Sequence, residues 1–215
     1  SKIFALSIQD EIRVTPKFLA SVGLRYDRYQ YRPELDGTNK FPISYDASHK
    51  TFAKPSWQVA LQYDLTEQHQ LGYKVSTGFR APKVEEMFFE FGKGGANHFM
   101  PNTDLKPETA LNQEITYLFK NDRSQFGIGI FHSKYRNFID ERVSEGWQPN
   151  PWYDPHSPWG GGPFLSVNQI QFVNVARASI SGVEMQGAMN GKLIGLSENL
   201  NCNFKGQYSR GHNQD

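Results

Sequence analysis

The chain has 215 residues, and its 23 Lys and Arg against 22 Asp and Glu give a formal net charge of +1, so no strong basic field favours a nucleic acid as its partner. Mean hydropathy is −0.62, and no run approaches the roughly 18 apolar residues that a membrane helix needs, which excludes a helical membrane protein. The single cysteine, Cys202, excludes an internal disulfide and a multi-cysteine metal site.

Low mean hydropathy is nevertheless compatible with a transmembrane β-barrel, because its strands alternate lipid-facing apolar residues with lumen-facing polar ones. Apolar and polar residues alternate at period two in eight segments, and each segment has a strongly polar face. The strands are expected at 4–9, 18–27, 57–65, 71–80, 111–120, 126–130, 183–189 and 199–208. The sequence therefore predicts an all-β fold.

The connections between these strands alternate strictly between short and long. Short turns are expected at 15–17, 66–69, 121–124 and 191–195, and long loops at 33–55, 81–107 and 143–168. This alternation is typical of an outer-membrane barrel with short periplasmic turns and long extracellular loops. A β-sandwich has no reason to gather its long loops at one end. It stays as the alternative, because alternation alone does not say which face is buried.

Five motifs, in chain order, resemble those of TonB-dependent outer-membrane receptors. They are Thr77–Pro82 (TGFRAP), Glu85–Phe88 (EEMF), Asn102–Thr109 (NTDLKPET), Tyr135–Asp140 (YRNFID) and Asn174–Glu184 (NVARASISGVE). The resemblance runs from about Trp57 to Met189 and is closest to receptors for haemoglobin and haem. In those receptors, Phe-Arg-Ala-Pro and Asn-Pro-Asn-Leu boxes bracket a histidine. Here the second box departs from that pattern and reads Pro-Asn-Thr-Asp-Leu.

The resemblance implies an antiparallel transmembrane β-barrel of about 22 strands with a plugged lumen, of which this chain supplies about eight. Residues 1–215 are then expected to be part of the barrel domain, without the plug domain and the signal peptide. The implied location is the outer membrane of a Gram-negative bacterium, in contact with its lipid. The implied function is capture of haemoglobin or another haem carrier at extracellular loops, followed by haem import. The import would be energised by the TonB complex through a missing N-terminal part, with haem as transported ligand and not as permanent cofactor.

Residues of the two boxes are expected to position the loop between them. Pro82 ends its strand because proline offers no N–H to the ladder. The arginine of the first box is expected to pair with Glu108 across neighbouring strands. The positioning set comprises Phe79, Arg80, Ala81, Pro82, Asn102 and Leu105.

His98 is the candidate haem ligand, because neutral imidazole binds haem iron well and the residue lies between the two boxes. Glycines and the apolar pair Phe99 and Met100 flank it, as suits a mobile extracellular loop. The alternative is an exposed loop histidine without a ligand. A stripe of apolar residues could line one face of a short helix after Pro82 and hold a flat apolar ligand, or form a local loop core. The stripe comprises Val84, Met87, Phe88, Phe89 and Phe91.

The third long loop is the candidate surface for a protein partner, because large aromatic residues dominate binding hot spots. Its prolines also lower the entropy lost on docking. A self-packed cap over the barrel mouth is the alternative. The aromatic residues are Trp147, Trp152, Tyr153, Trp159 and Phe164.

Three other functions compete with haem capture. Uptake of a ferric siderophore, or of iron from another carrier such as a transferrin-like protein, would leave His98 dispensable. An adhesin or structural barrel of eight strands would need the strand pattern alone. An enzyme is not expected, since the sequence contains neither a Gly-x-Ser-x-Gly elbow nor a His-Glu-x-x-His site.

Overall fold

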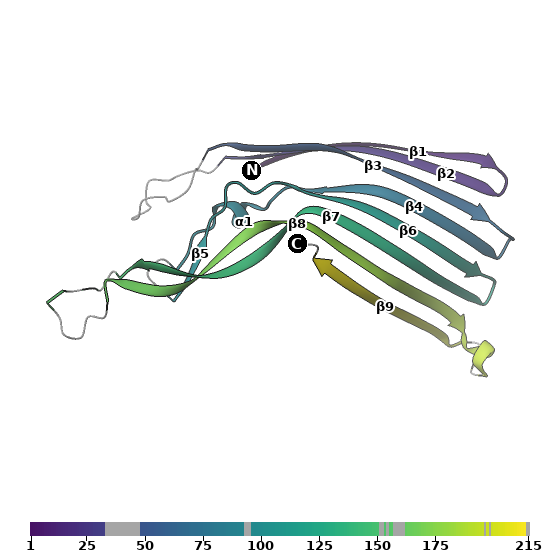
Figure 1. Ribbon diagram of the computed structural model, residues 1–215. Coiled ribbons are helices and arrows are strands. Elements are labelled where there is room, and N and C mark those ends of the chain that lie inside the picture. Colours follow the sequence, from purple (N-terminus) through teal and green to yellow (C-terminus); the bar gives the residue numbers. More distant parts are fainter. Residues whose placement is uncertain are drawn as a thin grey trace.

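The computed structural model describes residues 1–32, 48–92, 96–150, 153, 155–156, 162–195, 197 and 199–213. These residues form one curved sheet with a short helix under its outer end (Figure 1). The strands are β1 (Lys2–Thr15), β2 (Phe18–Tyr31), β3 (Lys50–Asp64), β4 (His69–Arg80), β5 (Asn97–Met100), β6 (Glu108–Lys120), β7 (Ser124–Pro149), β8 (Phe164–Asn190) and β9 (Asn201–Asn213). Helix α1 spans Val84–Phe88, and a 3-10 turn, η1, spans Gly191–Ile194.

All eight predicted strands are confirmed, and they follow one another as antiparallel neighbours. The sheet order is β1-β2-β3-β4-β6-β7-β8, with both β9 and β5 pairing to β8. The short strand β5 was not predicted. It lies inside the expected loop 81–107 and pairs in parallel with β8.

The strands are longer than predicted, and two of the expected long loops are correspondingly shorter. Strand β3 begins at Lys50, so Pro55 lies within it, opposite Tyr26. Proline is tolerated at this point because pairing between β3 and β4 stops at Gln58 and Ser76, which leaves the β4 side of β3 without a ladder. Strands β7 and β8 also extend into the expected loop 143–168, down to the pair Pro149 and Phe164. The loop prediction was therefore wrong for residues 143–149 and 164–168.

The two faces of the sheet differ sharply in chemistry. Register places Tyr73, Ile115, Ile130, Val183 and Tyr208 in one row across five strands. Neighbouring rows on this apolar face carry further large exposed residues: Leu6, Ile8, Leu24, Trp57, Leu71 and Met185. The opposite, polar face carries Lys74 opposite Glu114 in one row and Glu184 opposite Gln207 in the next.

An apolar face left exposed across a single sheet is the arrangement of a barrel wall, whose outer residues meet lipid. A sandwich would bury that face against a second sheet, and none forms among the described residues. Strands β1 and β9 do not pair with each other in this part of the chain, so the sheet is open and is not a closed eight-stranded barrel. No helix within the described ranges is long and apolar enough to cross a membrane, which leaves crossing by strands untested.

Candidate functional site

The candidate site lies at the long-loop end of the sheet, where the chain leaves β4 and returns as β6. Arg80 is the last residue of β4, and its guanidinium makes two hydrogen bonds to Glu108, Nε to Oε2 at 2.8 Å and an Nη to Oε1 at 2.7 Å. The predicted pairing of these two residues is confirmed. The same guanidinium donates to both oxygens of Glu86 in α1, at 2.9 and 3.0 Å.

Both carboxylates of this cluster are buried, and each also accepts a backbone N–H. Lys83 N–H donates to Glu86 at 2.8 Å, and Ile139 N–H donates to Glu108 at 2.7 Å. The ion cluster therefore connects the ends of β4 and β6 to α1 and β7. The sequence motifs included Glu86 but did not predict its pairing with Arg80, because the turn that brings α1 back to Arg80 is not visible in the strand pattern.

Arg80 is positively charged in this cluster. A tilted strand crosses a bilayer in about 9–11 residues, and Arg80 is the last of the 12 residues of β4 counted from the short-turn end, so it lies at the outer rim. Hydrogen bonding to Glu108, followed by that to Glu86, raises the pKa of Arg80 further above its ordinary value. The ion cluster therefore remains charged and links the ends of β4 and β6 to α1 and β7.

A small apolar core lies beside this ion cluster. Met87 is fully buried, and Leu105, Tyr31 and Ile139 pack with it. Pro82 and Ala81 are also buried, so three of the predicted positioning residues, Ala81, Pro82 and Leu105, are buried beside the ion cluster of Arg80. Phe79 packs its ring against Tyr29 at a centroid distance of 6.0 Å.

Side-chain amides anchor the returning segment to β7 and β8. Asn102 donates through Nδ2 to the carbonyl of Phe172 at 2.8 Å, and its Oδ1 accepts the N–H of Asp104. Asn174 accepts the N–H of Lys106 at 2.7 Å and donates to the Lys106 carbonyl at 2.9 Å and to the Asn137 carbonyl at 2.8 Å.

Asn137 lies at an irregularity of β7. Its φ is +55°, and the β7–β8 register skips it, passing from Arg136–Arg177 to Phe138–Val175. Asparagine tolerates this left-handed conformation better than most residues. Asn137 and Asn174 were noticed only as parts of motifs, and their joint role as a clamp became visible only from their position in the sheet.

The structure places His98 in β5, where its backbone pairs with Gln169. The side chain is 12% exposed, and its Nε2 lies 3.3 Å from Oε1 of Glu90. His98 is therefore neither a freely exposed loop residue nor unpartnered. Among the described residues, no group of three or more His, Cys, Asp or Glu is arranged to hold a metal ion.

An exposed aromatic cluster lies where Phe91 bridges to Phe99, the residue that follows His98. Phe89 stacks on Phe91 at 6.1 Å and meets Phe99 edge-on at 6.0 Å. Phe89 and Phe91 are 50% and 65% exposed. We call Phe89, Phe91 and Phe99 the aromatic platform. Two backbone hydrogen bonds between Phe91 and Phe99 hold it together.

The expected single helical face was wrong. Helix α1 ends at Phe88, so Phe89 and Phe91 lie beyond it. Within the helix, Met87 points into the core and Val84 points to solvent. The apolar stripe is thus divided between a local core and an exposed platform.

The aromatic residues predicted for a protein partner lie on a two-stranded arm. Register pairs continue from Val143–Ile170 to Pro149–Phe164, and the arm projects beyond the rest of the sheet (Figure 1). Trp147, Phe164 and Tyr153 are 72%, 57% and 42% exposed. Trp152 and Trp159 lie outside the described residues. The described part of the arm is therefore not a self-packed cap.

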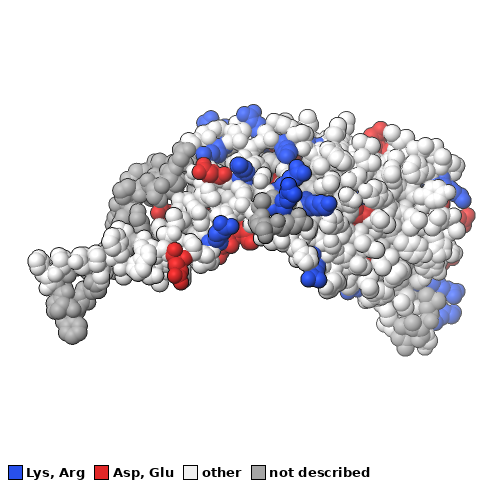
Figure 2. Space-filling view, in the orientation of Figure 1, with Lys and Arg blue, Asp and Glu red and all other residues white. Residues whose placement is uncertain are grey.

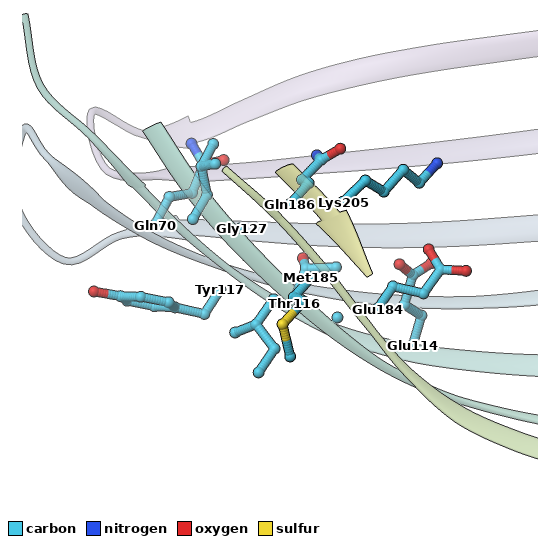
Figure 3. A pocket seen from close by; sticks show the side chains of 12 residues that line it. Gln70, Glu114, Thr116, Tyr117, Gly127, Glu184, Met185, Gln186 and Lys205 are labelled. Atoms are coloured by element: carbon cyan, nitrogen blue, oxygen red, sulfur yellow. The ribbon is translucent and has the colours of Figure 1, made fainter. Parts of the chain in front are cut away.

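A separate hollow of about 260 Å³ lies in the wall near the short-turn end of the sheet (Figure 3). Gly127 and Gly129 contribute no side chains there, and Glu114, Glu184 and Lys205 lie around them. The register of β6, β7, β8 and β9 places these charged residues on the polar face of the sheet. It is far along the strands from the long-loop site.

Comparison with known proteins agrees with this architecture. Residues 1–213 match the family model described as TonB dependent receptor-like, beta-barrel. Relatives include the probable hemoglobin and hemoglobin-haptoglobin-binding protein 4 of Haemophilus influenzae, 33% identical over 84% of this chain and 18% of its own length. Another is the hemoglobin-haptoglobin utilization protein B of Neisseria meningitidis serogroup A, 29% identical over 91% of this chain and 25% of its own.

Solved structures show the same fold. The siderophore receptor PirA of Pseudomonas aeruginosa covers 97% of this chain with 32% of its own, at 20% identity and a TM-score of 0.61. The copper transporter OprC covers 98% with 29% of its own, at 19% identity and a TM-score of 0.66. The chain thus spans roughly a fifth to a quarter of the two named relatives. Since the family model covers nearly the whole chain, the chain belongs to the TonB-dependent receptors, β-barrel receptors and transporters of the Gram-negative outer membrane that are not enzymes.

Proposed function

We propose that the protein containing this chain captures haemoglobin or another haem carrier at its outer surface and imports haem with TonB-dependent energy. The relatives named for haemoglobin and haemoglobin-haptoglobin binding support this substrate class. The observation that carries it is the exposed aromatic platform, because its stacked and edge-on rings suit a flat apolar macrocycle. His98 precedes Phe99 in β5, so its side chain points to the opposite face of that strand and must turn toward the platform before its imidazole can bind the iron.

His98 would act as the haem ligand after a local movement. Its side chain is largely covered and lies against Glu90, so Nε2 must leave that carboxylate before it can meet iron. Strand β5 has only four residues, so moving it disrupts fewer backbone hydrogen bonds than opening a long strand would.

The test is an absorbance titration of the full-length receptor with haemin, comparing wild type with His98→Ala. We expect a Soret shift in wild type that His98→Ala abolishes, with haemin affinity about tenfold weaker because an axial ligand is lost. His132→Ala is the matched control, since His132 bonds Ser181 on the apolar face, away from the platform. An unchanged Soret shift in His98→Ala would reject the ligand role and leave the receptor role in place.

The projecting arm is proposed as the contact for the protein carrier. Replacing Trp147–Ser166 by Asn-Gly should retain the ladder as far as the pair Gly146–Val167, because Asn-Gly favours a two-residue hairpin turn. The replacement spares all four β5–β8 pairs. We expect globin binding in a pull-down to fall at least about tenfold, as truncated hot spots cost about 2 kcal/mol or more, while haemin titration stays unchanged. Equal loss of both would contradict the separation of roles.

A second candidate is uptake of a ferric siderophore or of iron from another carrier. The pairing of His98 with Glu90 favours it, because that contact gives the histidine a structural role that needs no haem. The departure of the second box from Asn-Pro-Asn-Leu points the same way. In this case wild-type protein would bind neither haemoglobin nor haemin, and it would bind a ferric siderophore or another iron carrier.

A further inference from the structure

A cationic hollow opens in the sheet at its long-loop end. It has a volume of about 620 Å³, and Lys54, Lys106, Arg136 and Arg177 line it together with Phe79. No acidic residue lines it. All four cationic side chains are exposed, and none forms an ion pair with another described residue.

Register places the two arginines on the apolar face. Thr109, Arg136 and Arg177 form one row across β6, β7 and β8, and this row has the same parity as the row of Ile115, Ile130 and Val183. Counted from the aromatic Phe119 near the short-turn end, a tilted strand needs about 9–11 residues to cross a bilayer, which brings β6 to Thr109–Leu111. The arginines therefore lie where the outward face leaves the hydrocarbon and meets the headgroups of the outer leaflet.

A second hollow with similar composition lies on the neighbouring strands. It has a volume of about 310 Å³ and is lined by Lys2 and Arg28 beside Phe4 and Tyr26. Arg28 pairs with Ala53, and Ala53 lines the first hollow, so the two adjoin. Figure 2 shows Lys and Arg side chains gathered at the long-loop ends of the strands, with some Asp and Glu nearby, and a smaller group of Lys and Arg at the short-turn end, while the surface between is mostly uncharged. We call these two hollows the cationic belt.

The belt carries an electrostatic cost in the absence of an anion. Arg136 and Arg177 stand directly opposite each other in the β7–β8 ladder. Like charges in directly opposed positions destabilise an antiparallel pair. An anion between the two guanidinium groups would convert this repulsion into two charge-assisted contacts, and phosphate matches the fork of arginine bidentately.

We propose that the cationic belt binds the phosphate groups of an anionic glycolipid of the outer leaflet, of the lipid A type. Cationic residues at the membrane boundary attract anionic headgroups, and the aromatic residues of the belt pack against the first carbons of the acyl chains. The acyl chains of the glycolipid then lie along the rows of apolar residues on the apolar face, between the belt and the short turns. The proposal requires only the position of the sheet in an outer membrane and is independent of the transported ligand.

The test uses the full-length receptor, purified in detergent and delipidated, with bisphosphorylated lipid A as probe and native mass spectrometry as readout. Arg136→Gln/Arg177→Gln should retain about tenfold less lipid A than wild type, since two charge-assisted contacts are lost. The control is Lys120→Gln/Arg123→Gln, which removes two exposed cations at the short-turn end and should retain lipid A as wild type does. Heat-modifiable mobility on gels shows that each variant is folded.

Two further measurements use wild-type protein only. In 1 M salt the Debye length falls to about 3 Å, so retention of lipid A should drop severalfold, and lipid A with its phosphates removed should bind no better than an uncharged detergent. Equal retention by Arg136→Gln/Arg177→Gln and wild type overturns the proposal. So does equal binding of the phosphorylated and dephosphorylated lipids, which would show recognition of acyl chains alone. Displacement by millimolar inorganic phosphate alone, without any preference for lipid A, would show a simple anion site and would also overturn it.

Discussion

Single side chains at the outer rim do more to hold the loop than its motifs suggested. Arg80 binds two carboxylates at once, and Asn174 satisfies three backbone groups on two different segments. Buried polar groups are costly unless paired, so such residues tolerate little change.

Asn174→Asp should loosen residues 101–107. The aspartate keeps the acceptor for the Lys106 N–H but loses both donated hydrogen bonds and faces two carbonyl oxygens. We expect a cost of about 2–3 kcal/mol, measured as faster amide hydrogen exchange in this segment of the full-length receptor.

Asn121→Asp is the matched control for that change. Asn121 uses only its Oδ1, which accepts from the N–H groups of Arg123 and Ser124 and from the Ser124 hydroxyl. An aspartate retains those acceptors, so exchange at its turn should be unchanged. Equal effects of the two substitutions would show that the donated bonds of Asn174 carry no weight.

At the scale of elements, close cross-strand contacts explain certain glycines. A Cβ at Gly182 in β8 would come within 2.5 Å of the Phe131 ring and of the Tyr208 carbonyl oxygen. One of these neighbours is backbone on β9, so it cannot move without disturbing the β8–β9 ladder. The glycine of the motif Ile-Ser-Gly-Val-Glu is thus required by packing and not by an unusual φ.

Gly182→Ala should therefore destabilise the barrel by about 1–3 kcal/mol, the usual cost of overpacking. Gly127→Ala is the control, because its Cβ would meet nothing closer than 3.6 Å. The measurement is the urea midpoint for unfolding of the full-length receptor. A Gly182→Ala midpoint at or above that of Gly127→Ala would contradict the packing argument.

The extended arm shows where period-two reasoning stops being informative. Strands β7 and β8 continue for several pairs beyond the sheet as a two-stranded ribbon in which Val167 is buried but most of the described side chains on β7 are exposed. The β7 side of this ribbon has no apolar alternation, and residues such as Ser144, Glu145 and Gly146 were interpreted as loop. Pairing at the start of the arm is secured instead by β5, which adds to β8.

At the scale of the whole molecule, the sheet is an arc with two free long edges. Among the described residues, β1 pairs only with β2, and β9 pairs only with β8. Unpaired backbone groups cannot be satisfied in hydrocarbon, so only a closed barrel is stable in a bilayer. The remaining strands of a barrel of about 22 strands, which stays a prediction here, would complete these edges.

Residues 1–215 expressed alone should therefore fail to insert stably. In a vesicle-folding assay the isolated chain should show no heat-modifiable band, whereas the full-length receptor should show one. A folded, protease-resistant band from the isolated chain would mean that it closes on itself, and the eight-stranded alternative would return.

Local sequence determined the strands, the alternation of short and long connections, and the family, because alternation and turn chemistry are properties of neighbouring residues. It also located the Arg80–Glu108 pair, since Arg80 ends a predicted strand and Glu108 directly follows the predicted loop 81–107. Only the tertiary structure decided that His98 is covered in β5, that Asn174 reaches Lys106 68 positions away, and that arginines from β7 and β8 meet at the membrane boundary. These features depend on register between strands distant in sequence. A one-residue slip would turn every side chain to the other face, and no local pattern reports that register.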